Sequence, residues 1–284
     1  METVVSSAKE EVRIGPDLPF VIIGERINPT GRKRLAEMLR QGDLSVVRQD
    51  AIAQVEAGAH IIDVNVGVPG VDEPALLVAA VKAVSEVVDA PLCIDSANAA
   101  ALEAALAVYK GKALVNSVNG EESRMRAVLP LVKKHGAAVV CLTMDDRGIP
   151  PEVETRLEIA KRILARASEV GVPACDLVVD PLVLPVGVDH TAARVTLDAL
   201  KRITEELGLN TTMGASNVSF GLPDRESINA SFLIASIGRG LTSAITNPLL
   251  PDLRKAIAAG NLLMGHDEYA ANWIRTFRAS QKKA

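Results

Sequence analysis

The sequence has 284 residues, of which 48% are hydrophobic, 23% charged and 2% aromatic, and its formal net charge is −4. This composition excludes a disordered chain, and the length is typical of one α/β barrel. The scarcity of aromatic residues and the lack of a basic block argue against nucleic acid as a partner.

Cysteine usage and the N-terminal segment indicate the compartment. Cys93, Cys141 and Cys175 lie far apart and form no C-x-x-C motif, so free thiols in a reducing environment are the favoured interpretation. The N-terminal segment lacks the apolar core of a signal peptide, and no apolar run reaches the roughly 20 residues that span a membrane. We expect a cytoplasmic protein with no membrane partner.

Short runs rich in Val, Ile, Leu or Ala recur along the chain at fairly even spacing, and each has the length of a β-strand. In chain order, the predicted strands are Val21–Arg26, His60–Val66, Pro91–Ser96, Ala113–Val118, Ala137–Met144, Leu177–Val183, Thr211–Val218 and Leu241–Thr246.

Helical segments alternate with these strands. Gly136, Gly171 and Gly208 follow three of them as C-terminal stops, and Asp224 is a plausible N-cap for another. In chain order, the predicted helices are Asp72–Asp89, Asn98–Tyr109, Glu121–His135, Glu152–Val170, His190–Leu207, Asp224–Gly238, Pro251–Met264 and Asp267–Arg278.

The repeated strand–helix order with no linker predicts a single-domain (β/α)8 barrel over residues 20–284, preceded by an N-terminal extension over residues 1–19. This extension is expected to lie outside the barrel or to plug its bottom. An open, doubly wound sheet is the alternative, because hydrophobic periodicity does not distinguish a closed sheet from an open one.

Each predicted strand is apolar until its C-terminal end, where polar residues follow. In strand order they are Glu25, Arg26 and Asn28; Asp63 and Asn65; Asp95, Ser96 and Asn98; Asn116, Ser117 and Asn119; Thr143 and Asp145; Asp180; Asn217 and Ser219; and Asn247. Taken singly, Ser96, Asn98 and Asn119 are better explained as helix caps. Together, the polar strand ends predict a hydrogen-bonding barrel mouth, which is where this fold builds active sites.

The composition of this ring narrows the ligand. It is rich in Asp and Asn, and no glycine-rich phosphate loop accompanies it, so a pterin or purine edge with several N–H donors fits it best. A Mg²⁺ ion on Asp63, Asp95 and Asp180 is the competing use, but it requires an anionic substrate. None of the four histidines has the spacing of a zinc ligand, so we predict no metal site.

The strand-end motifs IGERIN, DVNVG, CIDSAN, VNSVN, LTMDDRGIP, VVDPLVLP and GASNVS occur in this order. This series resembles the pterin-binding methyltransferases, above all the methyltetrahydrofolate:corrinoid/iron–sulfur protein methyltransferases and, more distantly, the folate domain of cobalamin-dependent methionine synthase. The resemblance covers nearly the whole chain from about Phe20. It implies transfer of a methyl group between tetrahydrofolate and the cobalt of a corrinoid (cobalamin) protein, by a homodimeric enzyme.

Carried over position by position, the resemblance assigns roles to the ring. It implies that Asp95, Asn116 and Asp180 hold the pterin edge, that Asp63 and Asn65 line the same pocket, and that Arg225 stands in the loop after the seventh strand. Asn217 corresponds to the catalytic residue that reaches the methyl-bearing nitrogen. Glu25, Asn28 and Ser96 are expected to support these residues from behind.

A methyl group on a tertiary amine becomes reactive when its nitrogen gains positive charge. We expect Asn217 to stabilise that charge, with protons supplied through water near Asp95 and Asp180, because no ring residue has an obvious general-acid pKa. The chain lacks a D-x-H-x-x-G corrinoid-binding motif, so the corrinoid is expected on a partner protein.

Two alternatives remain. Dihydropteroate synthase shares the fold and a pterin site, but its Ser-x-Arg-Pro element is missing from the NVGVPGVD loop here. A non-catalytic folate-binding barrel is the other alternative, because a fold does not determine a function. The direction of methyl transfer is not readable from the sequence.

Overall fold

The computed structural model describes residues 1–281, and they form a single-domain (β/α)8 barrel. Its parallel strands follow the order β10-β3-β4-β5-β6-β7-β8-β9. Met213 O accepts a hydrogen bond from Ile245 N at 3.0 Å, which joins the two ends of the sheet and rejects the open-sheet alternative. The strands are β3 Val21–Ile27, β4 Ile61–Asn65, β5 Leu92–Asp95, β6 Leu114–Asn119, β7 Ala138–Leu142, β8 Leu177–Asp180, β9 Asn210–Thr211 and β10 Ser243–Thr246.

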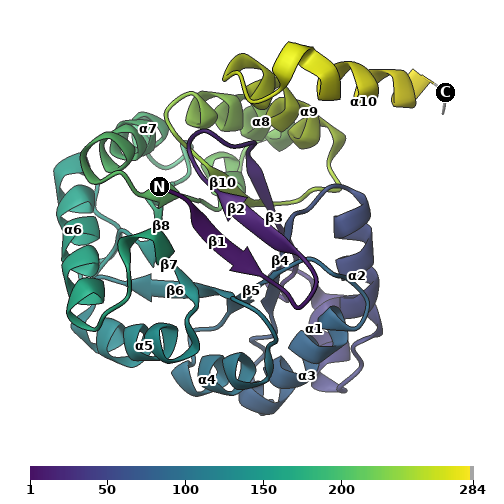
Figure 1. The fold of residues 1–284 in the computed structure, drawn as a ribbon, viewed down its shortest axis with the longest axis vertical. Helices are drawn as coiled ribbons and strands as arrows, with labels where there is room; N and C mark the ends of the chain where they lie inside the picture. The colour runs from purple at the N-terminus through teal and green to yellow at the C-terminus, as the bar shows by residue number, and fades with distance from the viewer. Residues whose placement is uncertain (282–284) are drawn as a thin grey trace.

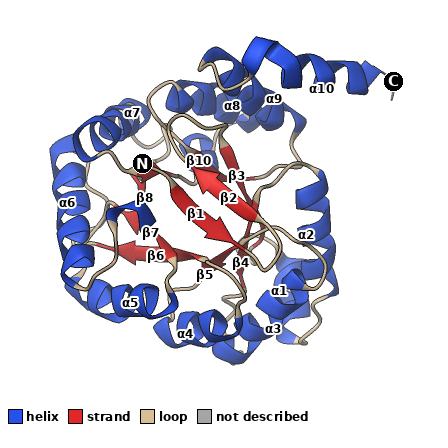
Figure 2. Cartoon of the chain, in the orientation of Figure 1, coloured by secondary structure: helices blue, strands red, loops and turns tan. Residues whose placement is uncertain are grey.

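Helices surround the strands on the outside (Figure 2). They are α1 Lys33–Arg40, α2 Ser45–Glu56, α3 Glu73–Ser85, α4 Ala99–Val108, α5 Glu122–His135, α6 Val153–Glu169, α7 Ala192–Arg202, α8 Arg225–Ile237, α9 Pro251–Leu263 and α10 Ala271–Gln281. The sequence did not predict α1 and α2. Neither begins with a side-chain N-cap, in contrast to α3 and α4, and α1 buries only Leu35 and Leu39, so few local signals mark these two helices.

The seventh predicted strand is mostly wrong. β9 ends at Thr211, and the 3-10 helix η3, Ala215–Ser219, occupies the rest of the predicted run. Asn217 N donates to Gly214 O at 3.2 Å, which turns the chain away from the sheet. Small and polar residues fill this segment, so its sequence carries no strong preference for a strand.

The last predicted helix is also divided. A short 3-10 turn, Glu268–Ala270, precedes α10, and Tyr269 has a left-handed φ of 52°. The carboxylate of Asp267 accepts from Asn272 N and Trp273 N, both at 2.9 Å, and so caps α10. Figure 1 shows α10 leading away from the barrel.

A hairpin closes the amino-terminal end of the barrel. Strands β1, Thr3–Ser6, and β2, Glu11–Ile14, pair antiparallel and cross the barrel in Figure 1. Val5, Val12 and Ile14 pack in one buried cluster with inward-facing strand residues such as Ile23 and Val178. Because these apolar groups fill the interior, water has no access from below, and the barrel opens only at the carboxyl ends of its strands.

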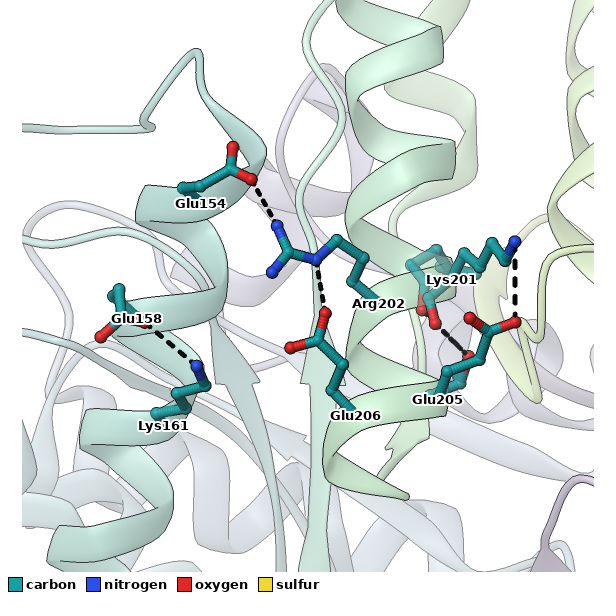
Figure 3. A network of polar contacts seen from close by, with 9 residues as sticks. Glu154, Glu158, Lys161, Lys201, Arg202, Glu205 and Glu206 are labelled. Atoms are coloured by element: carbon teal, nitrogen blue, oxygen red, sulfur yellow. Dashed lines mark hydrogen bonds and ion pairs between the residues drawn. The ribbon is translucent and has the colours of Figure 1, made fainter.

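The outer surface between α6 and α7 carries an ion-pair network (Figure 3). Arg202 donates to Glu154 across the two helices and to Glu206 on its own side. These side chains are at least one-third exposed to solvent, so the pairs contribute little to stability. Among residues 1–281, no helix has the length and apolar content needed to cross a membrane.

Candidate active site

Part of the polar ring predicted from the sequence lies on neighbouring strands, where the two-residue period directs the side chains inward. Register pairs place Asn65 beside Asp95 and Asp95 beside Asn116 on neighbouring strands. Asp63 lies one inward position below Asn65, next to Cys93. Directly beneath these groups are the apolar interior residues of the barrel. The ring is therefore a polar layer on a dry floor.

Two amides orient two of the carboxyl groups. Asn65 Nδ2 donates to Asp95 Oδ2 at 2.9 Å, and Asn116 Nδ2 donates to Asp63 Oδ1 at 3.3 Å. Asn65 Oδ1 in turn accepts from Gly67 N at 2.9 Å, which holds the amide in place. Four of the residues assigned to the pterin thus form two hydrogen-bonded pairs across strands β4, β5 and β6.

Burial raises the pKa values of the ring carboxyl groups. It raises the pKa of Glu25 to about 7, that of Asp180 to about 7 and that of Asp95 to about 6. The pKa of Asp63 lies well above its usual range because burial and the nearby Asp95 charge both disfavour ionisation. The prediction that the ring holds no group with a general-acid pKa was therefore wrong, since Glu25 and Asp180 titrate near neutrality.

The predicted supporting residues lie at the edge of this layer. Buried Ser96 accepts from Asn98 N at 2.9 Å and donates to Glu73, while Asn98 accepts from Ala100 N at 3.0 Å and caps α4. The helix-cap interpretation is thereby confirmed for Asn98, whereas Ser96 holds the turn that precedes the cap. Asn119 likewise accepts from Glu121 N at 3.0 Å. Asn28 Oδ1 accepts from Thr30 N at 2.9 Å and closes the turn after β3.

Asn217 and Arg225 lie on the exposed rim. Asn217 is on the 3-10 turn, and among the described residues its side chain has no hydrogen-bond partner, so it is available to a ligand. The guanidinium of Arg225 donates to Ser216 O at 2.8 Å and Ser219 Oγ at 3.0 Å, and it stacks over the Phe220 ring at 5.9 Å. It therefore braces the turn that carries Asn217. Asp224 was expected to cap α8, but it has a left-handed φ of 47° and makes no capping bond.

Sequence reasoning missed two arginines behind the ring. Arg124 on α5 donates to Ser96 O at 2.9 Å, Ala97 O at 2.6 Å and Ser117 O at 2.7 Å, and so ties the ends of β5 and β6 together. Arg156 on α6 makes similar bonds to the loops after β7 and β8. An arginine early in a helix that follows a strand is the only local signal for this role.

Asp145 after β7 is a strand-end aspartate of another kind. Its carboxylate accepts from Arg147 at 2.9 Å and from Arg162 at 2.9 Å. These guanidinium groups hold the pKa of Asp145 far below its usual range. This carboxylate is already paired and has no need of a ligand.

The structure offers no support for a metal centre in the part of the chain that it describes. Residues 1–281 contain no group of three or more His, Cys, Asp or Glu side chains that could hold a metal ion. His60 Nδ1 accepts from Ile22 N at 3.0 Å near the start of β3, at the end of the barrel opposite the ring. The competing interpretation of Asp63, Asp95 and Asp180 as a Mg²⁺ site therefore has no geometric basis.

Comparison with known proteins identifies relatives of nearly the whole chain. The sequence is 33% identical over 267 residues to a methylcorrinoid:tetrahydrofolate methyltransferase from Eubacterium limosum, covering 91% of this chain and 96% of that protein. It is 32% identical over 259 residues to methionine synthase from Mycobacterium tuberculosis, covering 87% of this chain and 22% of that longer protein.

Solved structures with the same fold include dihydropteroate synthases from Yersinia pestis, at a TM-score of 0.67 and 17% identity, and from Xanthomonas albilineans, at 0.67 and 19%. Both alignments cover more than nine-tenths of this chain, 93% and 92%. At such identities, the likeness concerns the fold alone. The family model described as pterin binding enzyme matches residues 24–247, from the first barrel strand to the end of the last. The chain is therefore an enzyme of the pterin-binding family.

Proposed function

We propose that this enzyme moves a methyl group between tetrahydrofolate and the cobalt of a corrinoid carried by a separate protein. The observation that carries the proposal is the ring of buried carboxyl and amide groups on the dry barrel floor. Its support from outside the structure is the similarity to the methyltransferase of Eubacterium limosum, which extends over almost the full length of both chains.

The ring suits the pterin head of folate. A pterin edge presents an amino group and ring N–H donors, and ionised Asp95 and Asp180 would accept from them while Asn116 both donates and accepts. Asp63 and Asn65 would fix this set through the hydrogen bonds already present. In the ligand-free protein, burial removes water from Asp95 and Asp180 and so raises their pKa values. Hydrogen bonds from the ligand's N–H groups would stabilise the ionised carboxylates and lower these pKa values again.

The role of this chain in the reaction would be to stabilise positive charge on the folate nitrogen that carries the methyl group. When the methyl group departs, the electron pair of the carbon–nitrogen bond stays on the nitrogen, and a proton must neutralise it. The exposed amide of Asn217 would accept a hydrogen bond from the protonated nitrogen, and Glu25, with a pKa of about 7, would serve as a proton reservoir at the mouth. The corrinoid supplies the methyl acceptor or donor.

The sequence contains no D-x-H-x-x-G motif, which supports a corrinoid that arrives on a partner protein. A mouth open to solvent would receive it. We also propose a homodimer in the cytoplasm. The exposed apolar side chains of Leu263, Tyr269 and Trp273 beside the barrel support self-association, and three free cysteines support a reducing compartment.

A methyl-transfer assay in both directions tests the proposal. Methyltetrahydrofolate with reduced cobalamin, and tetrahydrofolate with methylcobalamin, should each give enzyme-dependent turnover, and methyltetrahydrofolate alone should give none. Asn217→Ala should lower the transfer rate with little change in folate affinity. Folate binding without transfer to any corrinoid acceptor would instead indicate a non-catalytic barrel. Condensation of a pterin diphosphate with p-aminobenzoate would indicate a dihydropteroate synthase.

A further inference from the structure

The chain after β8 makes a strained turn next to the ring. Leu182 has a φ of 61°, the left-handed region that non-glycine residues avoid, and β-carbon contacts make it cost about 1 kcal/mol or more. Leu182 N donates to Asp180 Oδ1 at 2.7 Å, so the turn directly orients this carboxyl group. Contacts with the surrounding protein must therefore stabilise the turn in this conformation.

Arg156 holds it from outside the barrel. Its side chain is 1% exposed, and it donates to Leu182 O at 2.7 Å and to Pro181 O at 2.9 Å. Its Nε donates to Pro150 O at 2.8 Å, which links the loop after β7 to the same point. The Pro181–Leu182 peptide group, whose N–H donates to Asp180, is therefore anchored together with the next peptide group to one guanidinium.

The burial of Arg156 is costly for the fold. Among residues 1–281, no carboxylate lies within ion-pair distance of it, and burial lowers its pKa. A buried cation whose partners are backbone carbonyl groups and the hydroxyl of Thr196 destabilises a protein relative to an apolar side chain of the same size. The one carboxyl group whose charge acts on it is that of Asp180.

The surroundings of Asp180 contain no other charged group that acts on it. Its register partner on β7 is Leu142, and Gly214 N, beyond β9, donates to it. Thr196 on α7 contacts the same turn through Leu182 O at 2.9 Å and is uncharged. Arg156 is thus the ionic neighbour of this carboxyl group.

We propose that Arg156 is a positioning residue for the folate site: it locks the Pro181–Leu182 turn so that Asp180 points to the pterin, and it provides the positive charge that favours ionised Asp180. The ligand in this statement rests on the proposed function. The same device recurs at Asp95, where Arg124 ties the adjoining loops by their carbonyl oxygens and its charge favours the ionised carboxylate.

Titration of the ligand-free protein tests the electrostatic half of this proposal. Carboxyl ¹³C resonances would be followed against pH in wild type, Arg156→Met, Arg156→Lys and the surface control Arg202→Met. Arg156→Met should raise the pKa of Asp180 further above neutrality, Arg156→Lys should raise it less, and Arg202→Met should leave it unchanged. An identical Asp180 titration in wild type and Arg156→Met would overturn the proposal.

Kinetics test the positioning half. At pH 7, Arg156→Met should raise the KM for methyltetrahydrofolate about tenfold or more while kcat at saturation falls less, and part of the loss should be recovered at pH 8.5. Arg156→Lys keeps the charge but loses the planar fork, so its KM should rise with little recovery at high pH. If Arg156→Met does not fold, an unchanged KM in Arg156→Lys would overturn the proposal.

The two experiments separate this inference from the function on which it rests. If wild type neither binds nor demethylates methyltetrahydrofolate, the proposed function fails, and the ¹³C titration still decides whether Arg156 governs Asp180. If wild type is active and the Arg156 variants match it in both experiments, the function stands and the role of Arg156 is refuted.

Discussion

Aspartates at strand ends behave in opposite ways inside and outside the barrel mouth. Asp180 ends β8 and faces the interior, where burial raises its pKa to about 7. Asp145 follows β7 on the outer side, where Arg147 and Arg162 hold its pKa far below the usual range. The two residues have the same chemistry and similar places in the chain, so their surroundings alone account for the difference.

The comparison separates a structural carboxylate from one that awaits a ligand. Asp145 has its partners in the folded protein and so stabilises it. Asp63, Asp95 and Asp180 have amide and backbone donors but no paired cation, and they stand over an apolar floor. Burying these carboxyl groups lowers the stability of the ligand-free protein, and a bound ligand can restore it, as is common at active sites.

The largest expected effect is on folate affinity. Asp180→Ala or Asp95→Ala should weaken binding of methyltetrahydrofolate on the order of a thousandfold, because N–H donors of the buried ligand would lose charged acceptors. Asp145→Ala should change it by less than about twofold. Isothermal titration calorimetry measures both. Equal losses of folate affinity in the Asp180 and Asp145 variants would show that the inner and outer aspartates do not differ in ligand binding.

The next effect is on stability. Asp180 has a folded-state pKa above its unfolded value, so its stabilising contribution is present below about pH 4 and is lost as the pH rises toward 7. Asp180→Asn should therefore be more stable than wild type by roughly 4 kcal/mol at pH 8, with the gain shrinking toward pH 4. Urea unfolding at several pH values checks this. Parallel curves for the two proteins would contradict it.

Folate affinity should fall as the pH falls, because the carboxyl groups of the ring become protonated. In the proposed site, binding would need ionised Asp95 and Asp180, whose pKa values in the free protein are about 6 and about 7. Affinity should fall by up to about tenfold per pH unit below pH 6 for each group that must lose its proton. Calorimetry in buffers of different ionisation enthalpy should show proton release at pH 6. Proton uptake there would contradict the proposed charge state.

The smallest effect concerns the outer aspartate. Asp145 has a folded-state pKa below its unfolded value, so its contribution is present above about pH 4 and is lost as the pH falls below that. Asp145→Asn should cost about 1 kcal/mol at pH 7, since its arginine partners are partly exposed. The cost should shrink as the pH falls from about 4 toward 2 in the same unfolding experiment, and a cost that stays constant over this range would point to lost packing.

The sequence by itself determined the strand count, the inward polar ring and the family. Strand and helix periods are local properties, and the motifs around Asp63, Asp95 and Asp180 lie at strand ends that a parallel barrel must bring together. The sequence did not show α1 and α2, whose start signals are weak, or the 3-10 turn at Asn217, where local preferences are nearly balanced.

Only the tertiary structure decided the ionisation of the ring. Burial above a floor that includes Val5 and Val12, far away in the sequence, raises the pKa of Asp180, and the charge of Arg156, on a helix outside the barrel, partly offsets that rise. Desolvation and charge–charge interactions depend on distance in space, and no local pattern encodes them. The identity of the candidate site residues could therefore be predicted from the sequence, whereas the protonation state of their carboxyl groups could not.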